Sequence, residues 1–305
     1  MKHIRIISPS GTINPDFIEG ASKRLRSWQY DVSESVHARG QYGRFSGTDA
    51  ERLSDITAAF SDPDVDIILC ARGGYGLQRI IDRVHAQSHL LNPLLTSKTL
   101  VGFSDITAMH QLCGLNNLPS LHGLMCKHIA TMPEECEALQ LFRQALNGEQ
   151  LTYHLPAHPL NRQGKVQGTL IGGNLSVLYG LQGTPYGLNA LIDAHPEGCI
   201  LFIEDIAERH YHIDRMIQNL RLSGVLQRIK GLIIGHFADC ESDPLMPARS
   251  IDQTILDAVA DYDYPVMFGF PAGHIDDNRP LWLNAPVLLS VDEYTSTLIT
   301  PFTDL

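Results

Sequence analysis

The sequence lacks the features that mark three large classes of proteins. It has no excess of positive charge, because 34 acidic residues outnumber 23 lysines and arginines and give a net charge of −11. No apolar run approaches the roughly 18 residues that a membrane-spanning helix needs. None of the six cysteines forms a C-x-x-C pair. These absences argue against a nucleic-acid partner, a membrane partner, and a zinc site or disulfide framework.

The cysteines and the amino-terminal residues favour a reducing compartment instead. Three of the six cysteines lie in apolar runs, which is typical of small buried thiols. The first residues, Met1–Gly11, contain too short an apolar stretch for a secretory signal peptide. We therefore expect a cytoplasmic protein.

Enough apolar residues are present for a large core. The 305 residues, 44% of them apolar, suggest about two domains. In the first half, short apolar runs alternate with segments of helical periodicity. We expect strands at Ile4–Ser8, Val65–Cys70 and Thr99–Phe103, and helices at Asn14–Trp28, Leu77–His85 and Ser104–Leu112. This alternation predicts a parallel-sheet α/β domain, flavodoxin-like, over residues 1–148.

The periodicity fades between residues 149 and 167, where turn-forming residues dominate. We predict a linker there and a second domain over residues 168–305. Apolar runs predict strands at Cys199–Ile203, Leu232–Ile234, Val266–Phe270 and Pro286–Val291, and periodicity predicts helices at Asn174–Leu181, His212–Ser223 and Ser250–Ala260. Together they favour an α/β domain with a mixed sheet and helices.

Ser104 stands at the junction of a predicted strand and a predicted helix. Its hydroxyl would lie near free N–H groups and the positive end of the helix, which can stabilise a negatively charged oxygen. Serine is also a common N-cap, so capping alone is an alternative. Gly73 and Gly74 at the neighbouring strand end favour a functional role, because glycine lets the backbone approach a ligand closely.

Glu204 and His274 each follow an apolar run in the second half. A carboxylate at the end of a buried strand is costly unless it is paired. Glu204 could therefore cap a helix, pair with Arg215 or orient a histidine. The imidazole of His274 has a pKa suited to proton transfer at neutral pH. Because the chain has 14 histidines, the position after a strand and a Pro/Gly turn, and not the residue type, singles out His274.

Other groupings give weaker signals. His210 and His212 are two residues apart and do not share a helix face. Cys126 and His128 lack a second pair at zinc-finger spacing. The run Arg72–Gly76 lacks both the full G-x-G-x-x-G pattern and a Walker lysine. We therefore expect no metal and no cofactor.

With these residues assembled, the sequence resembles the muramoyltetrapeptide LD-carboxypeptidases, which are serine peptidases with a Ser-Glu-His triad. The resemblance covers almost the whole chain. The motifs that carry it are Ser8-Pro9-Ser10-Gly11, Phe45–Thr48, Ala71–Gly76, Gly102–Asp105, Gly168–Asn174, Gly183–Pro185, Glu204-Asp205 and Gly273-His274. The combination of Arg-Gly-Gly-Tyr-Gly with Phe-Ser-Asp is specific.

The resemblance implies a mechanism and a substrate. Ser104 would be the nucleophile, His274 its base and Glu204 the carboxylate. Backbone amides near Gly74 and Asp105 would hold the oxyanion. This family removes the terminal D-Ala that follows diaminopimelate in murein tetrapeptides, during cell-wall recycling in the cytosol, and its members are typically homodimers with the active site between two domains.

Two aspects of substrate recognition stay open at this point. A carboxypeptidase must bind the terminal carboxylate of its substrate, and either Arg72 or nearby backbone amides could do so. The chain also departs from the family at Leu281–Asn284, where members often read Leu-Pro-Leu-Gly and this sequence has Leu-Trp-Leu-Asn. The departure puts the details of the substrate in doubt more than the chemistry.

Three alternatives compete with this interpretation. A related branch of the family cleaves an aminoacyl-adenylate-like antibiotic and confers self-immunity; it would need an aromatic side chain to stack on adenine, for which Trp282 and Tyr75 are candidates. An ordinary α/β-hydrolase would carry G-x-S-x-G, but Ile106 occupies the second glycine position. A binding protein without catalytic activity could hold a small ligand in the same cleft.

Overall fold

The first sheet is parallel except for one antiparallel edge strand. The computed structural model describes residues 1–91, 97–241, 243, 245–247 and 250–300 of the chain. Among these, the strand order is β11-β5-β4-β3-β1-β2, with β1 His3–Ile7, β2 Asp31–Glu34, β3 Ile67–Cys70, β4 Thr99–Gly102, β5 Ser120–His122 and β11 Leu281–Leu283. From β2 to β5 this is the order 2-1-3-4-5, which confirms the flavodoxin-like prediction.

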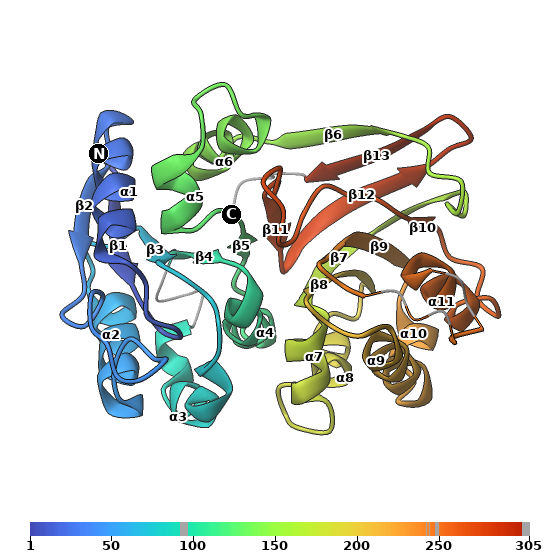
Figure 1. Ribbon diagram of the computed structural model, residues 1–305, viewed down its shortest axis with the longest axis horizontal. Coiled ribbons are helices and arrows are strands. Elements are labelled where there is room, and N and C mark those ends of the chain that lie inside the picture. The colour runs from blue at the N-terminus through green and yellow to red at the C-terminus, as the bar shows by residue number, and fades with distance from the viewer. Residues whose placement is uncertain (92–96, 242, 244, 248–249, 301–305) are drawn as a thin grey trace.

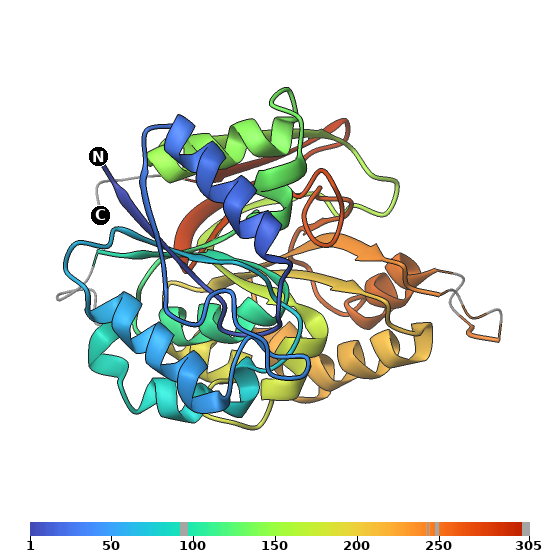
Figure 2. The same ribbon diagram turned by 60° about the vertical axis from the view of Figure 1, so that its left-hand side comes forward.

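Helices cover both faces of this sheet (Figure 1). One face carries α1 Pro15–Ser27, α5 Cys126–Thr131 and α6 Glu137–Asn147, and the other carries α2 Asp49–Ser61, α3 Ile81–His85 and α4 Thr107–Leu115. Short 3-10 turns lie at Leu77–Arg79, Ser88–Leu91 and Ser104–Ile106. The start of α1 is fixed by Asn14, whose side chain accepts from the Asp16 N–H, and by proline at the first helical position. Figure 2 shows α1 running alongside α5.

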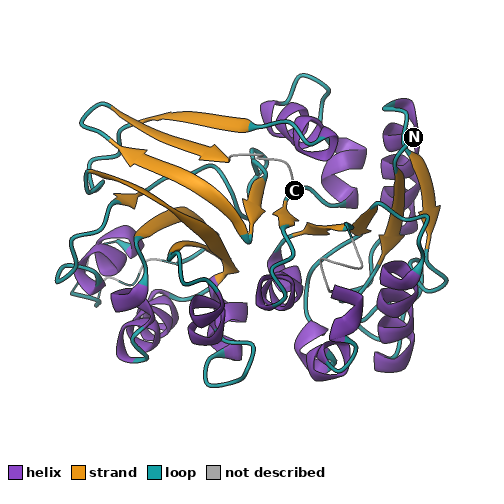
Figure 3. Ribbon diagram, turned by 180° about the vertical axis from the view of Figure 1, so that it is seen from behind, coloured by secondary structure: helices purple, strands orange, loops and turns teal. Residues whose placement is uncertain are grey.

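The second sheet is mixed. Its order is β10-β9-β8-β7-β12-β13-β6, with β6 Leu151–Pro156, β7 Gly164–Asn174, β8 Cys199–Ile206, β9 Gly231–Ala238, β10 Val266–Met267, β12 Ala285–Val291 and β13 Thr295–Thr300. The strands from β10 to β7 are parallel, and those from β7 to β6 are antiparallel. Helices α7 Leu175–Leu181, α8 Leu188–Ala194, α9 His210–Leu222, α10 Val225–Arg228 and α11 Ile251–Ala258 gather below the sheet (Figure 3).

The predicted strands and helices are present, with their ends shifted by a few residues. The helix expected at 77–85 is a 3-10 turn followed by α3, and the one expected at 104–112 is a 3-10 turn followed by α4. The strand expected at 266–270 is reduced to the two residues of β10. Within the described residues, no helix combines the length and the apolar character needed to cross a bilayer.

The segment 149–167, which was predicted as a linker, contains regular structure. It contains β6, which pairs with β13 at the edge of the second sheet, and the first residues of β7. Turn-forming residues at 156–164 separate these strands. The alternation of buried and exposed residues in β6 is too short to stand out from the sequence beside them. Residues 301–305, at the end of the predicted second domain, lie outside the described residues.

The two sheets share one core. Strand β11 comes late in the chain but pairs with β5, the last parallel strand of the first sheet. One cluster of buried apolar residues extends from β1 through β11 to β8 and β12 of the second sheet. The two halves are therefore packed together by hydrophobic burial, which stabilises them by roughly 25 cal/mol for each Å² of apolar surface removed from water.

The segment that departs from the family pattern lies at this junction. Trp282 is only 4% exposed within β11, so it is a core residue. Asn284 has a φ of 58°, a conformation that glycine or asparagine tolerates and most residues do not. Its side-chain amide donates to the His110 carbonyl at 2.9 Å and to the Ser120 hydroxyl at 3.2 Å. Asparagine thus keeps the backbone geometry of a glycine and adds hydrogen bonds between the halves.

We expect Asn284→Ala to lower the free energy of unfolding by about 2–3 kcal/mol, because it loses two hydrogen bonds and forces alanine into a left-handed conformation. Asn284→Gly loses only the hydrogen bonds and should cost about 1–2 kcal/mol. Urea denaturation of both variants measures the difference. Equal loss in the two variants would contradict the role given to the backbone conformation.

Candidate active site

Ser104 lies directly beyond the carboxyl end of β4, in a strained turn. Its φ is 66°, which is uncommon for a residue with a side chain, and its hydroxyl makes no capping hydrogen bond to the following helix. Capping is therefore not its role. A Cβ on Gly73 would lie 2.7 Å from the Ser104 Cβ, so only glycine permits this approach of the two loops. Strain of this kind is retained where the surroundings enforce it, which is common at functional sites.

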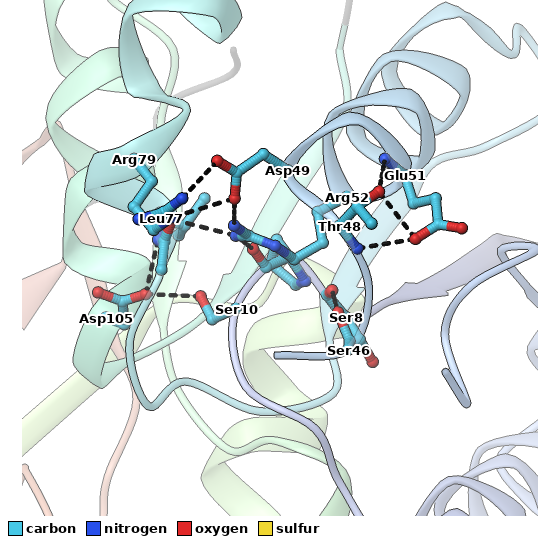
Figure 4. A network of polar contacts seen from close by, with 12 residues as sticks. Ser8, Ser10, Ser46, Thr48, Asp49, Glu51, Arg52, Leu77, Arg79 and Asp105 are labelled. Carbon is cyan, nitrogen blue, oxygen red and sulfur yellow. Dashed lines mark hydrogen bonds and ion pairs between the residues drawn. The ribbon is translucent and has the colours of Figure 1, made fainter. Parts of the chain in front are cut away.

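A buried arginine holds the loops around Ser104. Arg52 of α2 is fully buried, donates to the carbonyls of Pro9 and Gly76 at 2.6 and 3.0 Å, and pairs with Asp49 at 2.6 Å (Figure 4). Its guanidinium also lies 5.0 Å from the centre of the Phe45 ring. Arg52 thus joins the loop after β1 to the loop after β3.

The side chain of Asp105 joins the same loops from the other side. Its Oδ2 accepts from the Ser10 hydroxyl at 2.7 Å and from the Leu77 N–H at 3.0 Å (Figure 4). Burial raises the pKa of Asp105, against the effect of these hydrogen bonds and the charge of Arg52. The backbone N–H of Asp105 belongs to the first turn of a helix, where N–H groups have no intrahelical partner. The sequence pointed only to this N–H, whereas the structure gives the carboxyl group a role in joining the loops.

Glu204 and His274 form a direct pair. The Glu204 side chain is fully buried near the end of β8, and its Oε2 lies 2.8 Å from the Nδ1 of His274. Gly273 permits this approach, because a Cβ there would lie 2.9 Å from Glu204 Oε2. Glu204 therefore pairs with His274 and not with Arg215, whose guanidinium lies 5.6 Å from the Tyr211 ring centre.

The environment of His274 favours its charged form. Burial by itself lowers the pKa of His274, but the hydrogen bond that the imidazole donates to Glu204 and the charges of Glu204 and Asp205 outweigh it, so the pKa is raised from its ordinary value of 6.5. The imidazole also makes an edge contact with Phe103, with ring centres 4.9 Å apart. Because Phe103 precedes Ser104, this contact places His274 against the loop that carries the serine.

A second polar network joins the two halves beneath the site. The Asn174 N–H donates to the Thr107 hydroxyl at 2.9 Å, and Asn174 is the register partner of Glu204 between β7 and β8. A Cβ on Gly173 would lie 2.5 Å from the Thr107 Oγ1. Asp205 accepts from the Asn174 side chain at 2.9 Å, while burial and the Glu204 charge raise its pKa to about 7.

One cavity of about 710 Å³ contains the exposed parts of these groups. Ser104, Gly74 and His274 line it, and Glu204 lies behind His274. The remaining lining residues are Ile13, Asn14, Phe17, Ala71, Arg72, Gly73, Phe103, Met125, Lys127, His128, Ile206, Ile275 and Asp276. The volume falls within the range of about 300–1,000 Å³ found for small-molecule sites.

Several lining residues were not singled out from the sequence. Lys127, His128 and Asp276 reach the cavity from α5 and from the loop after His274. His128 was considered only as a metal ligand; burial lowers its pKa to about 4, so it is neutral. Among the described residues, no group of three or more His, Cys, Asp or Glu side chains could hold a metal ion. Of these three residues, Asp276 could have been predicted from the sequence, because it follows His274 by only two residues.

The two aromatic candidates for adenine stacking differ. Trp282 is 4% exposed in β11 and is not among the residues that line this cavity, so it is not placed to stack on a ligand beside Ser104. Tyr75 is 46% exposed and lies 5.9 Å from Phe45 between ring centres, outside the lining of the cavity. The cavity thus brings together a strained serine, a paired histidine and the backbone of Gly73 and Gly74, which is an arrangement suited to acyl transfer.

Comparison with known proteins identifies related sequences over most of the chain. Residues 4–123 match the LD-carboxypeptidase N-terminal domain, and residues 167–289 match the LD-carboxypeptidase C-terminal domain. A relative from Streptomyces coelicolor that carries the name of a carboxypeptidase is 32% identical, over 98% of this chain and 93% of its own. The murein tetrapeptide carboxypeptidase of Pseudomonas aeruginosa is 29% identical, over 90% and 89% of the two chains.

Solved structures show the same fold. The muramoyltetrapeptide carboxypeptidase from Oxalobacter formigenes superposes with a TM-score of 0.84 at 28% identity, covering 98% of both chains. The microcin C7 self-immunity protein, solved with aspartyl sulfamoyl adenosine, gives a TM-score of 0.79 at 20% identity, covering 98% of this chain and 96% of its own. At that identity the second likeness concerns the fold alone.

The pairing of Glu204 with His274 predicts a titration that NMR can follow. His274 should titrate above 6.5, and Glu204→Gln should lower its pKa by about 1–3 units, because the compensating charge is lost while burial remains. The imidazole signals of wild type and variant over a pH series measure this. Glu208→Gln, which removes a carboxylate paired with His212, should leave the His274 titration unchanged. An unshifted midpoint in Glu204→Gln would rule out the assigned pairing.

Proposed function

The chain belongs to the LD-carboxypeptidase family, and we propose that it is a serine peptidase that removes the terminal D-Ala from murein tetrapeptides. The observation that carries the proposal is the Glu204–His274 pair in the same cavity as the strained Ser104. The name of the Oxalobacter relative, a muramoyltetrapeptide carboxypeptidase, supports the choice of substrate.

The proposed first step is attack by the Ser104 hydroxyl on the carbonyl carbon that precedes D-Ala. His274 donates through Nδ1–H to Glu204, which leaves Nε2 as the acceptor for the serine proton. Glu204 fixes this tautomer and stabilises the imidazolium that forms. Activity therefore falls as the pH drops through the raised pKa of His274, because a protonated imidazole accepts no proton.

The backbone N–H groups of Gly74 and Asp105 are the proposed donors to the oxyanion. Asp105 follows Ser104 in the first turn of a helix, and Gly74 lies in the neighbouring loop with a φ of 104°, which glycine adopts without strain. A well-placed donor of this kind stabilises the transition state by about 3–4 kcal/mol. His274 then protonates the departing amine of D-Ala, and water hydrolyses the acyl-enzyme with His274 as base.

We also propose that the chain acts as a cytoplasmic homodimer, and that residues 1–148 and 168–305 are its two domains. The family resemblance supports the dimer. The six cysteines are all free thiols, which fits a reducing compartment. Under this division the nucleophile comes from one domain and its base and carboxylate from the other.

Ser104→Ala should lower the rate of D-Ala release about a thousandfold or more, because it removes the group that forms the acyl-enzyme. Mass spectrometry of purified murein tetrapeptide detects the loss of one D-Ala. Ser54→Ala, at an exposed hydroxyl of α2, is the matched control and should retain wild-type activity. Wild-type activity in Ser104→Ala would reject the mechanism. Cleavage of an acyl-sulfamoyl adenylate but not of the tetrapeptide would favour the self-immunity function.

Gly173→Ala should lower kcat/KM about 100-fold, because its Cβ would push Thr107 and the loop of Ser104 away from β8. The pKa of His274 should stay the same in this variant, since Glu204 and His274 lie on the same side of the contact between Gly173 and Thr107. Gly183→Ala is the matched control: it also has a positive φ, but nothing lies within 4 Å of its Cβ position. A loss of activity as large in Gly183→Ala would mean that backbone strain alone is responsible.

A further inference from the structure

The active-site cavity carries three charged side chains that the proposed mechanism does not use. Arg72 and Lys127 bring positive charge, and Asp276 brings negative charge. A carboxypeptidase acts only where the chain ends, so its site must hold the terminal carboxylate of the substrate. Arg72 and Lys127 are the two cations in the cavity that could do so.

Arg72 is fixed close to the proposed oxyanion site. It precedes Gly73, the residue that packs against Ser104, and its Nε lies 4.0 Å from the position that a Cβ on Gly74 would occupy. The same nitrogen lies 3.8 Å from the corresponding position on Gly11. The guanidinium therefore rests over the two glycine loops beside Ser104.

One hydrogen bond sets the direction of this guanidinium. Nη1 of Arg72 donates to the Thr12 carbonyl at 2.7 Å. In the part of the chain that the structure describes, Nε and Nη2 have no hydrogen-bond partner and the group makes no ion pair. The N–H groups of Nε and Nη2 are parallel and form the planar fork that binds a carboxylate through two oxygens.

In the substrate, the terminal carboxylate lies close to the carbonyl carbon that reacts. In a peptide that ends in D-Ala, three bonds separate the scissile carbonyl carbon from the terminal carboxylate carbon, so the two lie within about 4 Å of each other. Arg72 Nε lies 4.0 Å from the Cβ position at Gly74, so the fork is within reach of the carboxylate of a substrate whose scissile carbonyl is held by the Gly74 N–H.

Lys127 is less suited to this role. Both cations are exposed, but the ammonium of Lys127 on α5 is a single point charge without a planar fork. The charges of Lys127 and Asp276 act on the His128 imidazole in opposite directions. Arg72 is thus the cation of the cavity with both a fixed direction and free donors.

We infer that Arg72 binds the terminal carboxylate of the substrate through Nε and Nη2 and thereby restricts the enzyme to the end of the peptide. The inference rests on the proposed function. It assigns Arg72 a role in specificity, since a substrate without a free terminal carboxylate would leave the fork unpaired.

The test compares murein tetrapeptide with the same peptide ending in a carboxamide. The ratio of kcat/KM for the acid to kcat/KM for the amide measures recognition of the carboxylate. Wild-type enzyme should favour the acid, and Arg72→Gln should lower the ratio about 10- to 100-fold, because charge-assisted hydrogen bonds are lost. Arg72→Lys should recover part of the ratio, since it keeps the charge but not the fork. Lys127→Gln, the matched control in the same cavity, should keep the wild-type ratio.

Different results would overturn different conclusions. If wild type releases D-Ala and Arg72→Gln keeps the wild-type ratio, or if Lys127→Gln loses it, the inference is wrong and the proposed function stands. If wild type releases no D-Ala from the tetrapeptide, the proposed function fails and the inference fails with it. Labelling of Ser104 by a serine-reactive phosphonate in each variant verifies that the protein is folded, so that a changed ratio reports on recognition.

Discussion

The close contact between Thr107 and the end of β7 is the constraint on which the site depends. Thr107 opens α4, three residues after Ser104, and it receives a hydrogen bond from Asn174, the strand neighbour of Glu204. Gly173 has no side chain, and any Cβ there would collide with the threonine. The hydrogen bond between the Asn174 N–H and the Thr107 hydroxyl thereby fixes the position of the Ser104 loop relative to the strand that carries Glu204.

The loops at the site are held by buried polar groups, and this explains how a strained turn can persist. Arg52 and Asp105 satisfy carbonyl, hydroxyl and N–H groups of the two loops that follow β1 and β3, and Asp105 itself lies beyond the end of β4. Buried polar groups are costly when unpaired, so each hydrogen bond disfavours any arrangement in which the loops separate. The strain at Ser104 is small beside the cost of breaking this network.

Much of the fold follows from local pattern. The apolar runs ending in Cys70 and Ile203 predict buried parallel strands because such strands are covered on both faces. Strand β11 could not be predicted, since three residues have no periodicity and their partner lies about 160 positions earlier in the sequence. The same limit applies to the site. Ser104, Glu204 and His274 were found from their positions after strands, whereas the buried Arg52 belongs to an ordinary amphipathic helix and owes its role to contacts made by distant loops.

The placement of β11 has a consequence for the order in which the protein can fold during synthesis. Strands β1 to β5 leave the ribosome first, but the outer edge of β5 gains its partner only when residues 281–283 have been made. Until then the N-terminal half exposes an unpaired strand edge and the apolar residues that β11 later covers. Exposed edges of this kind invite pairing with other chains. During synthesis of this protein, the first sheet therefore lacks its closing strand until almost the whole chain has been made.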